Sequence, residues 1–217
     1  MHKPGYQTGA RHDCGTTNEG VSVKDQNSMS RRHRERGFSL IEVTVGILIV
    51  LIVSAMAIIA LSPTRQQLQA DAAMVEVASQ LRKAREIAIE QRRDVAITFD
   101  TGNESISLTQ ENLPAGTTAL GTVPIQPPAV FMLMPGMPDT PDGFGNNDSL
   151  YFNGINGGPV GMAFQSDGTF VDAAGDLVNG TVFMGISGVP SSARAVTILG
   201  ATGKIHMYKG NGTGWEQ

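Results

Sequence analysis

The sequence predicts an α+β protein in which a long N-terminal α-helix packs on an antiparallel β-sheet or sandwich. Three observations support this prediction. An apolar stretch covers residues 38–61, an amphipathic helical pattern follows over residues 62–93, and short alternating runs fill residues 94–217. A helix followed by many strands is typical of α+β domains, where the helix covers one face of the sheet.

The apolar stretch from Phe38 to Leu61 is about 24 residues long and contains a single charge, Glu42. A helix of about 20 apolar residues crosses a bilayer. A buried core helix is rarely apolar over this length, and an ordinary secretory signal has only about 7–15 apolar residues. We therefore predict a transmembrane helix over residues 38–61.

The segment that precedes this helix is basic. Residues 1–37 hold seven Lys or Arg and four acidic residues, a net charge of +3, while the whole chain carries −4, so the remainder carries −7. Basic residues beside a membrane span favour the cytoplasmic side. We expect a single-pass protein with its N-terminus in the cytoplasm and its C-terminal domain outside it.

The only cysteine, Cys14, lies in this basic segment. If residues 1–37 are removed as a leader, the mature chain has no disulfide, thiolate metal site or cysteine nucleophile.

Residues 62–93 continue the helix, after a kink or short break expected at Ser62-Pro63. Apolar residues recur there at spacings of three and four, which predicts one buried helix face. We expect this face to pack on the protein's own domain; its members are Met74, Val77, Leu81, Ala84 and Ala88.

From residue 94 onward the pattern predicts an antiparallel β domain. Asp94–Asp100 and Glu104–Gln110 alternate apolar and polar residues around the turn Thr101–Asn103, which indicates a β-hairpin. Further expected strands are Ala129–Met134, Leu150–Phe152, Gly161–Gln165, Gly168–Val171, Thr181–Ile186, Arg194–Leu199 and Lys204–Lys209.

The junction between leader and helix carries a motif. Arg36-Gly37-Phe38-Ser39-Leu40-Ile41-Glu42-Val43 resembles the class III signal of type IV prepilins and type II secretion pseudopilins. The resemblance implies cleavage between Gly37 and Phe38 by a prepilin peptidase in the bacterial inner membrane. It also implies N-methylation of Phe38 and a pilin-like fold.

The chemistry of these residues agrees with that expectation. Gly37 has no side chain, so an extended backbone can enter a protease cleft at this point. A charged carboxylate inside a membrane span is energetically costly, so the charge of Glu42 is expected to be either solvated or paired. It either reaches the headgroups or, as the resemblance implies, pairs with the Phe38 amine of a neighbouring subunit during assembly.

The C-terminal domain is similar to minor pseudopilins of the GspH/FimT type. Three segments carry this similarity: Gln80–Ile89, Phe164–Thr169 and Val196–Ile205. We therefore expect a minor pseudopilin, a structural subunit of a type II secretion pseudopilus that takes part in protein secretion. The alternative is a minor type IV pilin of the FimT type, in pilus assembly or DNA uptake.

The expected partners are prepilin peptidase, other pseudopilins or pilins contacted through the N-terminal helix, and the inner membrane. Nucleic acid is not expected, because residues 104–217 contain three basic and nine acidic residues and binding requires several phosphates to be neutralised at once.

No catalytic set, cofactor motif or metal motif is recognised. Asp139–Asp148 and Asp167–Asp176 are interpreted as turns, with calcium binding as the alternative. His206 is interpreted as a strand histidine.

Overall fold

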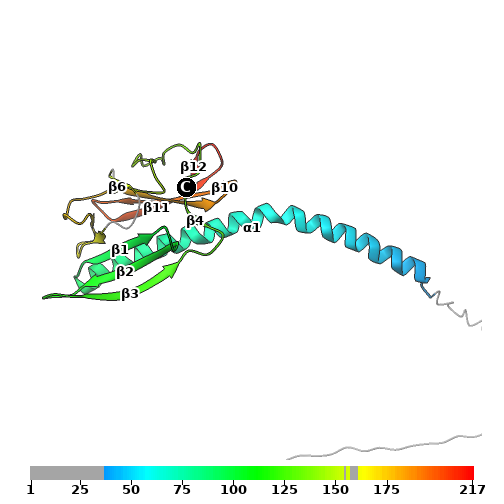
Figure 1. The fold of residues 1–217 in the computed structure, drawn as a ribbon, viewed down its shortest axis with the longest axis horizontal. Helices are drawn as coiled ribbons and strands as arrows, with labels where there is room; N and C mark the ends of the chain where they lie inside the picture. The colour runs from blue at the N-terminus through cyan, green and yellow to red at the C-terminus, as the bar shows by residue number, and fades with distance from the viewer. Residues whose placement is uncertain (1–36, 154, 157–160) are drawn as a thin grey trace, which may run out of the picture. The chain divides into compact units, whose positions relative to one another are not determined.

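The computed structural model describes residues 37–217 except 154 and 157–160, and only the backbone of residues 59–63 and 155–156. The predicted leader, residues 1–37, lies outside the described residues apart from Gly37. The described part contains one helix and twelve strands (Figure 1). Within it, Leu48–Gln217 form one compact unit.

The helix α1 extends from Leu40 to Gln91 without interruption. Of the kink or short break expected at Ser62-Pro63, the break does not occur: a proline removes one backbone hydrogen bond, and helical turns continue on both sides of it. The helix ends where Arg92 takes a left-handed conformation (φ 52°). The Arg93 N–H then donates to the Ala88 carbonyl at 3.1 Å, which is the bond of a Schellman C-cap.

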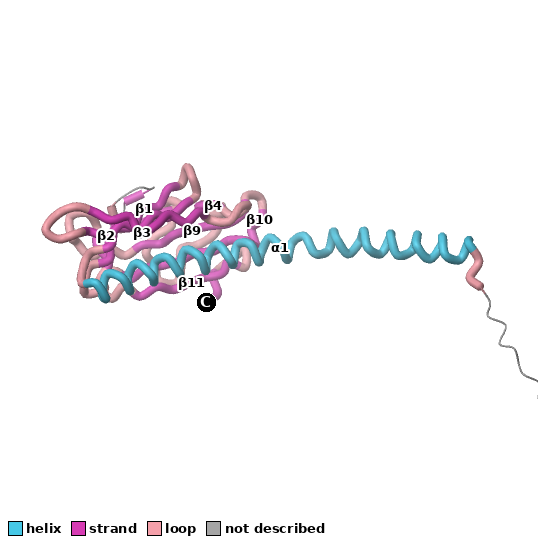
Figure 2. Tube along the Cα trace, turned by 90° about the horizontal axis from the view of Figure 1, so that it is seen from below, coloured by secondary structure: helices cyan, strands magenta, loops and turns pink. Residues whose placement is uncertain are grey.

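The predicted apolar face of the helix is confirmed. All five expected residues are buried, and further small residues of the same helix join them in the core: Ala70, Ala73 and Ala78. Alanines on this face let the helix backbone approach the strands closely. Figure 2 shows the second half of α1 lying along the strands.

Two antiparallel sheets form the rest of the domain. The five-stranded sheet has the order β3-β2-β1-β7-β8, and the seven-stranded sheet has β12-β11-β10-β9-β5-β6 with β4 beside β9. Their bounds are β1 Val95–Asp100, β2 Ser105–Glu111, β3 Thr117–Pro124, β4 Val130–Phe131, β5 Leu150–Phe152, β6 Ile155–Asn156, β7 Met162–Phe164, β8 Phe170–Val171, β9 Gly180–Ile186, β10 Val189–Leu199, β11 Lys204–Gly210 and β12 Trp215–Glu216.

The predicted hairpin is confirmed as β1 and β2, which pair from Val95↔Gln110 to Asp100↔Ser105. The strand β3 was not predicted, because almost all of its residues are exposed and no burial alternates along it. β6 and β12 were also missed, since two residues are too few to show a period. β10 begins at Val189, five residues before the expected start, because a register shift between Val189 and Arg194 interrupts its pattern.

One hydrophobic core joins the helix and both sheets. Phe152 of the seven-stranded sheet stacks on Phe99 at 5.7 Å and contacts Phe170 at 5.9 Å, both in the five-stranded sheet. Phe164 lies 4.9 Å from Phe170 between ring centroids. The helix contributes Leu81 and Val77 to the same cluster. The α+β fold, with a long helix on antiparallel sheets, is therefore confirmed.

Candidate functional site

The first candidate site is the start of the described chain. Gly37, Phe38 and Ser39 precede the helix, and nothing lies within 4 Å of the position a Cβ would occupy on Gly37. Phe38 is 80% exposed. The peptide bond between Gly37 and Phe38 is thus in accessible, non-helical backbone.

Ser39 stands at the N-cap of α1. Its carbonyl accepts hydrogen bonds from the N–H groups of Glu42 at 2.9 Å and Val43 at 3.2 Å. Glu42 is in the first turn of the helix, where a carboxylate interacts favourably with the helix dipole. Its side chain is exposed. The sequence therefore places Glu42 one turn beyond the cleavage position expected from the motif.

The helix segment that follows is long and apolar enough to cross a membrane. Leu40–Ile58 has a mean hydropathy of 2.6, and none of it is buried within the chain. A soluble core helix of this composition would be covered by other parts of the protein. This segment instead offers its whole apolar surface to lipid or to other chains.

A second candidate site lies where α1 meets two turns of the sheets. Arg85 of α1 donates from Nε to the Gly168 carbonyl at 3.2 Å and from Nη2 to the Thr202 carbonyl at 3.1 Å. Gly203 approaches so closely that a Cβ there would collide with the Gly168 carbonyl oxygen. The three segments that carry the GspH/FimT resemblance thus meet at one side chain, Arg85.

Beside Arg85 lies an open groove of about 650 Å³ between α1 and β11, which we call the cationic groove. Three cations, two carboxylates and two apolar side chains line it: Arg82, Arg85, Lys204, Glu86, Glu90, Ile89 and Ile205. The count of basic and acidic residues that argued against nucleic-acid binding covered only residues 104–217. It therefore did not include Arg82 and Arg85. Packing of the helix against β11 adds these two cations to Lys204.

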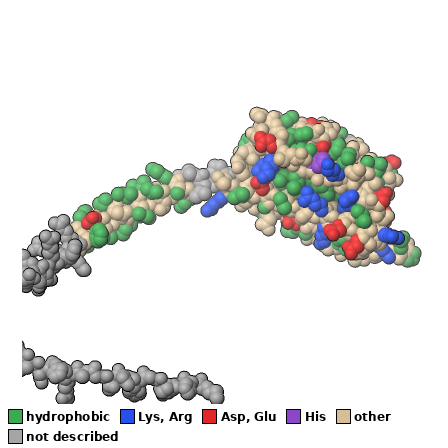
Figure 3. Space-filling model, turned by 180° about the vertical axis from the view of Figure 1, so that it is seen from behind, with side chains coloured by type: hydrophobic (Ala, Val, Ile, Leu, Met, Phe, Trp, Pro, Cys, Tyr) green, Lys and Arg blue, Asp and Glu red, His purple; other side chains and the backbone are tan. Residues whose placement is uncertain are grey.

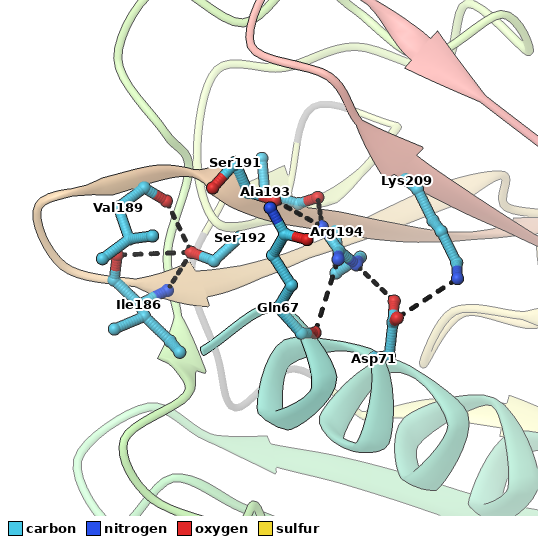
Figure 4. A network of polar contacts seen from close by, with 9 residues as sticks. All are labelled: Gln67, Asp71, Ile186, Val189, Ser191, Ser192, Ala193, Arg194 and Lys209. Carbon is cyan, nitrogen blue, oxygen red and sulfur yellow. Dashed lines mark hydrogen bonds and ion pairs between the residues drawn. The ribbon is translucent and has the colours of Figure 1, made fainter. Parts of the chain in front are cut away.

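A third cluster fastens the helix to the seven-stranded sheet (Figure 4). Arg194 of β10 is only 4% exposed, and its Nε donates to the Asp71 carboxylate of α1 at 2.7 Å. Its Nη1 donates to the carbonyls of Ser191 and Ala193, and Nη2 to that of Gln67. Lys209 contacts the other Asp71 oxygen at 3.2 Å.

This pairing changes the acidity of Asp71. Partial burial raises the pKa of its carboxyl group, but hydrogen bonds from Arg194 and Lys209 lower it by more. The pKa of Asp71 therefore lies below its ordinary value, and the carboxylate is charged whenever the protein is near neutral pH.

Comparison with known protein families gives one decisive match. Residues 32–58 match the family described as "Prokaryotic N-terminal methylation motif". The matched residues include Arg32, Arg34 and Arg36, the Gly37–Phe38 junction, Glu42 and most of the exposed apolar segment. This chain has a prepilin-type N-terminus.

The prepilin-type chain is also similar in structure to solved proteins. The minor pseudopilin EpsH from the type 2 secretion system of Vibrio cholerae has 13% sequence identity and a TM-score of 0.45, covering 65% of this chain and 97% of that one. Two crystal forms of the type IV minor pilin FimU from Pseudomonas aeruginosa strain PAO1 have 16% and 15% identity. Their TM-scores are 0.39 and 0.41. The two alignments cover 68% and 72% of this chain and 97% and 96% of the FimU chains. No curated protein matches the chain.

The prepilin-type chain also holds a polar cluster under the loop that follows β4. The Thr197 hydroxyl donates to Asp142, and His206 Nδ1 lies 3.1 Å from the same carboxylate. Burial raises the pKa of Asp142, while the hydrogen bonds from Thr197 and His206 lower it by more, so that it lies below its ordinary value. The interpretation of His206 as a hydrogen-bonded strand residue is confirmed.

The expected turns are also confirmed. Asp139, Asp167 and Asp172 each accept hydrogen bonds from backbone N–H groups of their own turns. Within the described ranges, no three His, Cys, Asp or Glu side chains are placed to hold a metal ion together.

Sequence reasoning missed three residues of these clusters: Arg85, Asp71 and Asp142. Arg85 and Asp71 stand next to the apolar stripe of the helix, at its border. Such border positions are the available signal, because a charged side chain there can reach a neighbouring strand while its stem packs on apolar surface. Asp142 gives no comparable signal, since it belongs to a loop rich in turn residues.

Proposed function

We propose that this chain is a minor pseudopilin, a structural and non-enzymatic subunit of a type II secretion pseudopilus involved in protein secretion. The observation that carries this proposal is the match of residues 32–58 to the methylation motif. The apolar helix segment that begins within that motif is not buried by any of the other described residues, as an anchoring and assembly helix requires.

Residues 1–37 would be the leader that prepilin peptidase removes between Gly37 and Phe38, with methylation of the new Phe38 amine. The accessible backbone at Gly37 and the exposure of Phe38 support this assignment. Residues 38–61 would then anchor the chain in the inner membrane. Residues 62–93 and the β domain of residues 94–217 would lie outside the cytoplasm.

Assembly would use the same helix. Cleavage creates a positive charge at Phe38, and pairing with Glu42 of a neighbouring pseudopilin or pilin would neutralise both groups in the membrane. A buried charge without a partner is strongly unfavourable, so the pair would favour assembled subunits over free ones.

Processing is tested by mass spectrometry of the membrane-extracted protein. We expect an N-terminus at methylated Phe38 in cells that contain the peptidase, and a full-length chain when Gly37→Leu fills the cleavage position. Gly46→Ala is the matched control, because a Cβ at Gly46 also meets no atom within 4 Å. A Met1 start in peptidase-competent cells would contradict the proposal.

The second candidate function is that of a minor type IV pilin of the FimT type, in pilus assembly or DNA uptake. The methylation motif is shared by both classes, and Arg82, Arg85 and Lys204 bring three cations to one groove. Glu86 and Glu90 line the same groove, so its net charge is small. Nucleic-acid binding depends on many cation–phosphate contacts, so this charge balance disfavours the DNA-uptake role.

A deletion strain distinguishes the two candidates. We expect secretion of extracellular enzymes to be lost and then restored by the wild-type chain, while surface pili are unchanged. Loss of pili with normal secretion would assign the chain to the type IV pilus instead.

A further inference from the structure

Cationic residues are unevenly distributed over this chain. The 100 residues from Asp94 to Ala193 contain no Lys or Arg and ten acidic residues. All nine Lys and Arg residues after Gly37 lie on α1, directly after its end, or on β10 and β11: Arg65, Arg82, Lys83, Arg85, Arg92, Arg93, Arg194, Lys204 and Lys209. Figure 3 shows Lys and Arg side chains gathered on one face of the globular part. The cation-bearing face of one copy is therefore electrostatically complementary to the acidic part of a second copy.

The cationic groove lies on this cation-bearing side. Among the described residues, neither Arg82 nor Lys204 takes part in an ion pair. Ile89, which also lines the groove, is 41% exposed. The groove therefore offers two unpaired cations next to uncovered apolar surface, a combination that fits a segment with both an acidic and an apolar side chain.

The acidic part of the same chain contains a segment of this chemistry. The loop Asp172–Leu177, which we call the acidic loop, follows β8 and carries Asp176 and Leu177 at its end. Leu177 is 54% exposed, and with Leu113 it is one of two large apolar side chains that are exposed in the described residues after Asp94.

The acidic loop is also held in one conformation. An oxygen of the Asp172 side chain accepts hydrogen bonds from the N–H groups of Ala174 at 2.9 Å and Asp176 at 3.0 Å. Leu177 forms a β-bridge with Val171. A loop that is already ordered loses little conformational entropy when it binds.

We propose that the acidic loop of one copy of this chain docks into the cationic groove of a second copy. Leu177 packs on Ile89, and Asp176 lies near Lys204 and Arg82. Glu86 and Glu90 also line the groove and repel an acidic segment, so the contact depends on Asp176 approaching Lys204 and Arg82 while Leu177 covers Ile89.

This contact is weak by itself. Stable protein interfaces bury about 1,200–2,000 Å², more than one loop in one groove can provide. Copies held side by side in a membrane, however, meet at high effective concentration, which makes weak contacts significant. The inference thus rests on the proposed function, which brings the copies together through their helices.

Disulfide crosslinking in cells tests the contact. The full-length chain is used with Cys14→Ser, which removes its only native cysteine. One tagged copy carries Ile89→Cys and a second, differently tagged copy carries Leu177→Cys. We expect oxidation to give a mixed dimer at about five times or more the yield of the control pair Ile89→Cys with Leu113→Cys, since about 1 kcal/mol of contact energy corresponds to a factor of this size.

Charge reversal identifies the interaction. Lys204→Glu in the groove copy should lower the crosslinking yield about fivefold, because like charges then face each other. Asp176→Lys in the loop copy should restore most of it. Equal yields for the test and control pairs, or a yield that Lys204→Glu does not change, would overturn the contact.

Two further results separate this inference from its alternatives. An N-terminus at Phe38 with crosslinking at the control level contradicts the contact but leaves the proposed function standing, whereas a Met1 start contradicts the proposed function whatever the crosslinking yield. Binding of the detergent-solubilised chain to a duplex oligonucleotide that Lys204→Glu abolishes, without crosslinking, would assign the groove to nucleic acid and overturn the inference.

Discussion

The Asp71 carboxylate on α1 accepts a hydrogen bond from the Arg194 guanidinium on β10 at 2.7 Å, across 123 residues of sequence. Arg194 is almost completely buried, while Asp71 is 26% exposed. A buried guanidinium without a counter-charge is strongly destabilising. Asp71 therefore fixes the position of the helix against the seven-stranded sheet.

We expect Asp71→Asn to lower the free energy of unfolding by about 2–3 kcal/mol, because it leaves the buried Arg194 without its counter-charge. Urea unfolding of the full chain in detergent measures this, followed by fluorescence of Trp215, the only tryptophan. Trp215 reports on the domain because its ring lies 5.8 Å from that of Phe183.

Lys209→Met is the matched control for this pair. Lys209 contacts the same carboxylate but is 54% exposed, and exposed ion pairs contribute about 0–1 kcal/mol. An equal decrease in the free energy of unfolding for Asp71→Asn and Lys209→Met would contradict this role of Asp71. It would mean that the carbonyls of Gln67, Ser191 and Ala193 are sufficient to hold Arg194.

The Asp71–Arg194 pair also indicates what the sequence can predict about this fold. The buried face of Leu81 and Ala88 was predictable because helical periodicity is local, and so was the β1–β2 hairpin with its short turn. The sequence does not reveal which strand crosses a given turn of the helix. The pairing of Asp71 with Arg194 depends on that long-range packing, and so do the meeting of Arg85 with two turns and the cationic groove.

The candidate site also has a part that the local sequence predicts and a part that it does not. Gly37, Phe38 and Glu42 belong to one short motif and could be selected from sequence, whereas their processing and assembly roles are still predictions. Strand β3 was missed for a different reason. Its residues are exposed on both faces of the sheet, so burial imposes no alternation on the sequence there.

Arg85 holds together the helix and the two turns at Gly168 and Thr202. We expect Arg85→Met to lower the free energy of unfolding by about 1–2 kcal/mol, since two carbonyls lose a charged donor while the methionine keeps most of the packing. Lys83→Met, an exposed neighbour on the same helix, should change it by less than about 0.5 kcal/mol. Urea unfolding of both variants measures the difference, and similar values for the two would contradict the role of Arg85.

The free energy of unfolding should decrease at acidic pH. The pKa values of Asp71 and Asp142 lie below their ordinary value in the folded protein, so the unfolded chain binds more protons than the folded one as the pH decreases. Their contribution is fully present above the unfolded value of about 3.9 and is lost as the pH falls through the lowered folded values. Unfolding free energies measured between about pH 7 and pH 3 should therefore decrease mainly below about pH 4.

Asp142→Asn tests how much Asp142 contributes to the decrease in the free energy of unfolding at low pH. It keeps the size of the side chain but removes the charge that Thr197 and His206 stabilise, so the decrease below about pH 4 should become smaller than in the wild type. Asp176→Asn, an exposed carboxylate, is the control. An acid decrease as steep in Asp142→Asn as in the wild type would mean that other carboxylates cause it.

Glu42→Gln separates membrane insertion from assembly. All apolar residues of the segment Leu40–Ile58 are kept in this variant, so we expect normal insertion and cleavage at Phe38. Incorporation into filaments should fall about tenfold or more, because the amine of a neighbouring Phe38 loses its counter-charge, which is worth at least about 1.4 kcal/mol. Quantitative blotting of sheared filament and membrane fractions measures the ratio. Glu42→Asp keeps the charge and should retain more incorporation than Glu42→Gln; equal incorporation of wild type and Glu42→Gln would show that Glu42 only reaches the headgroups.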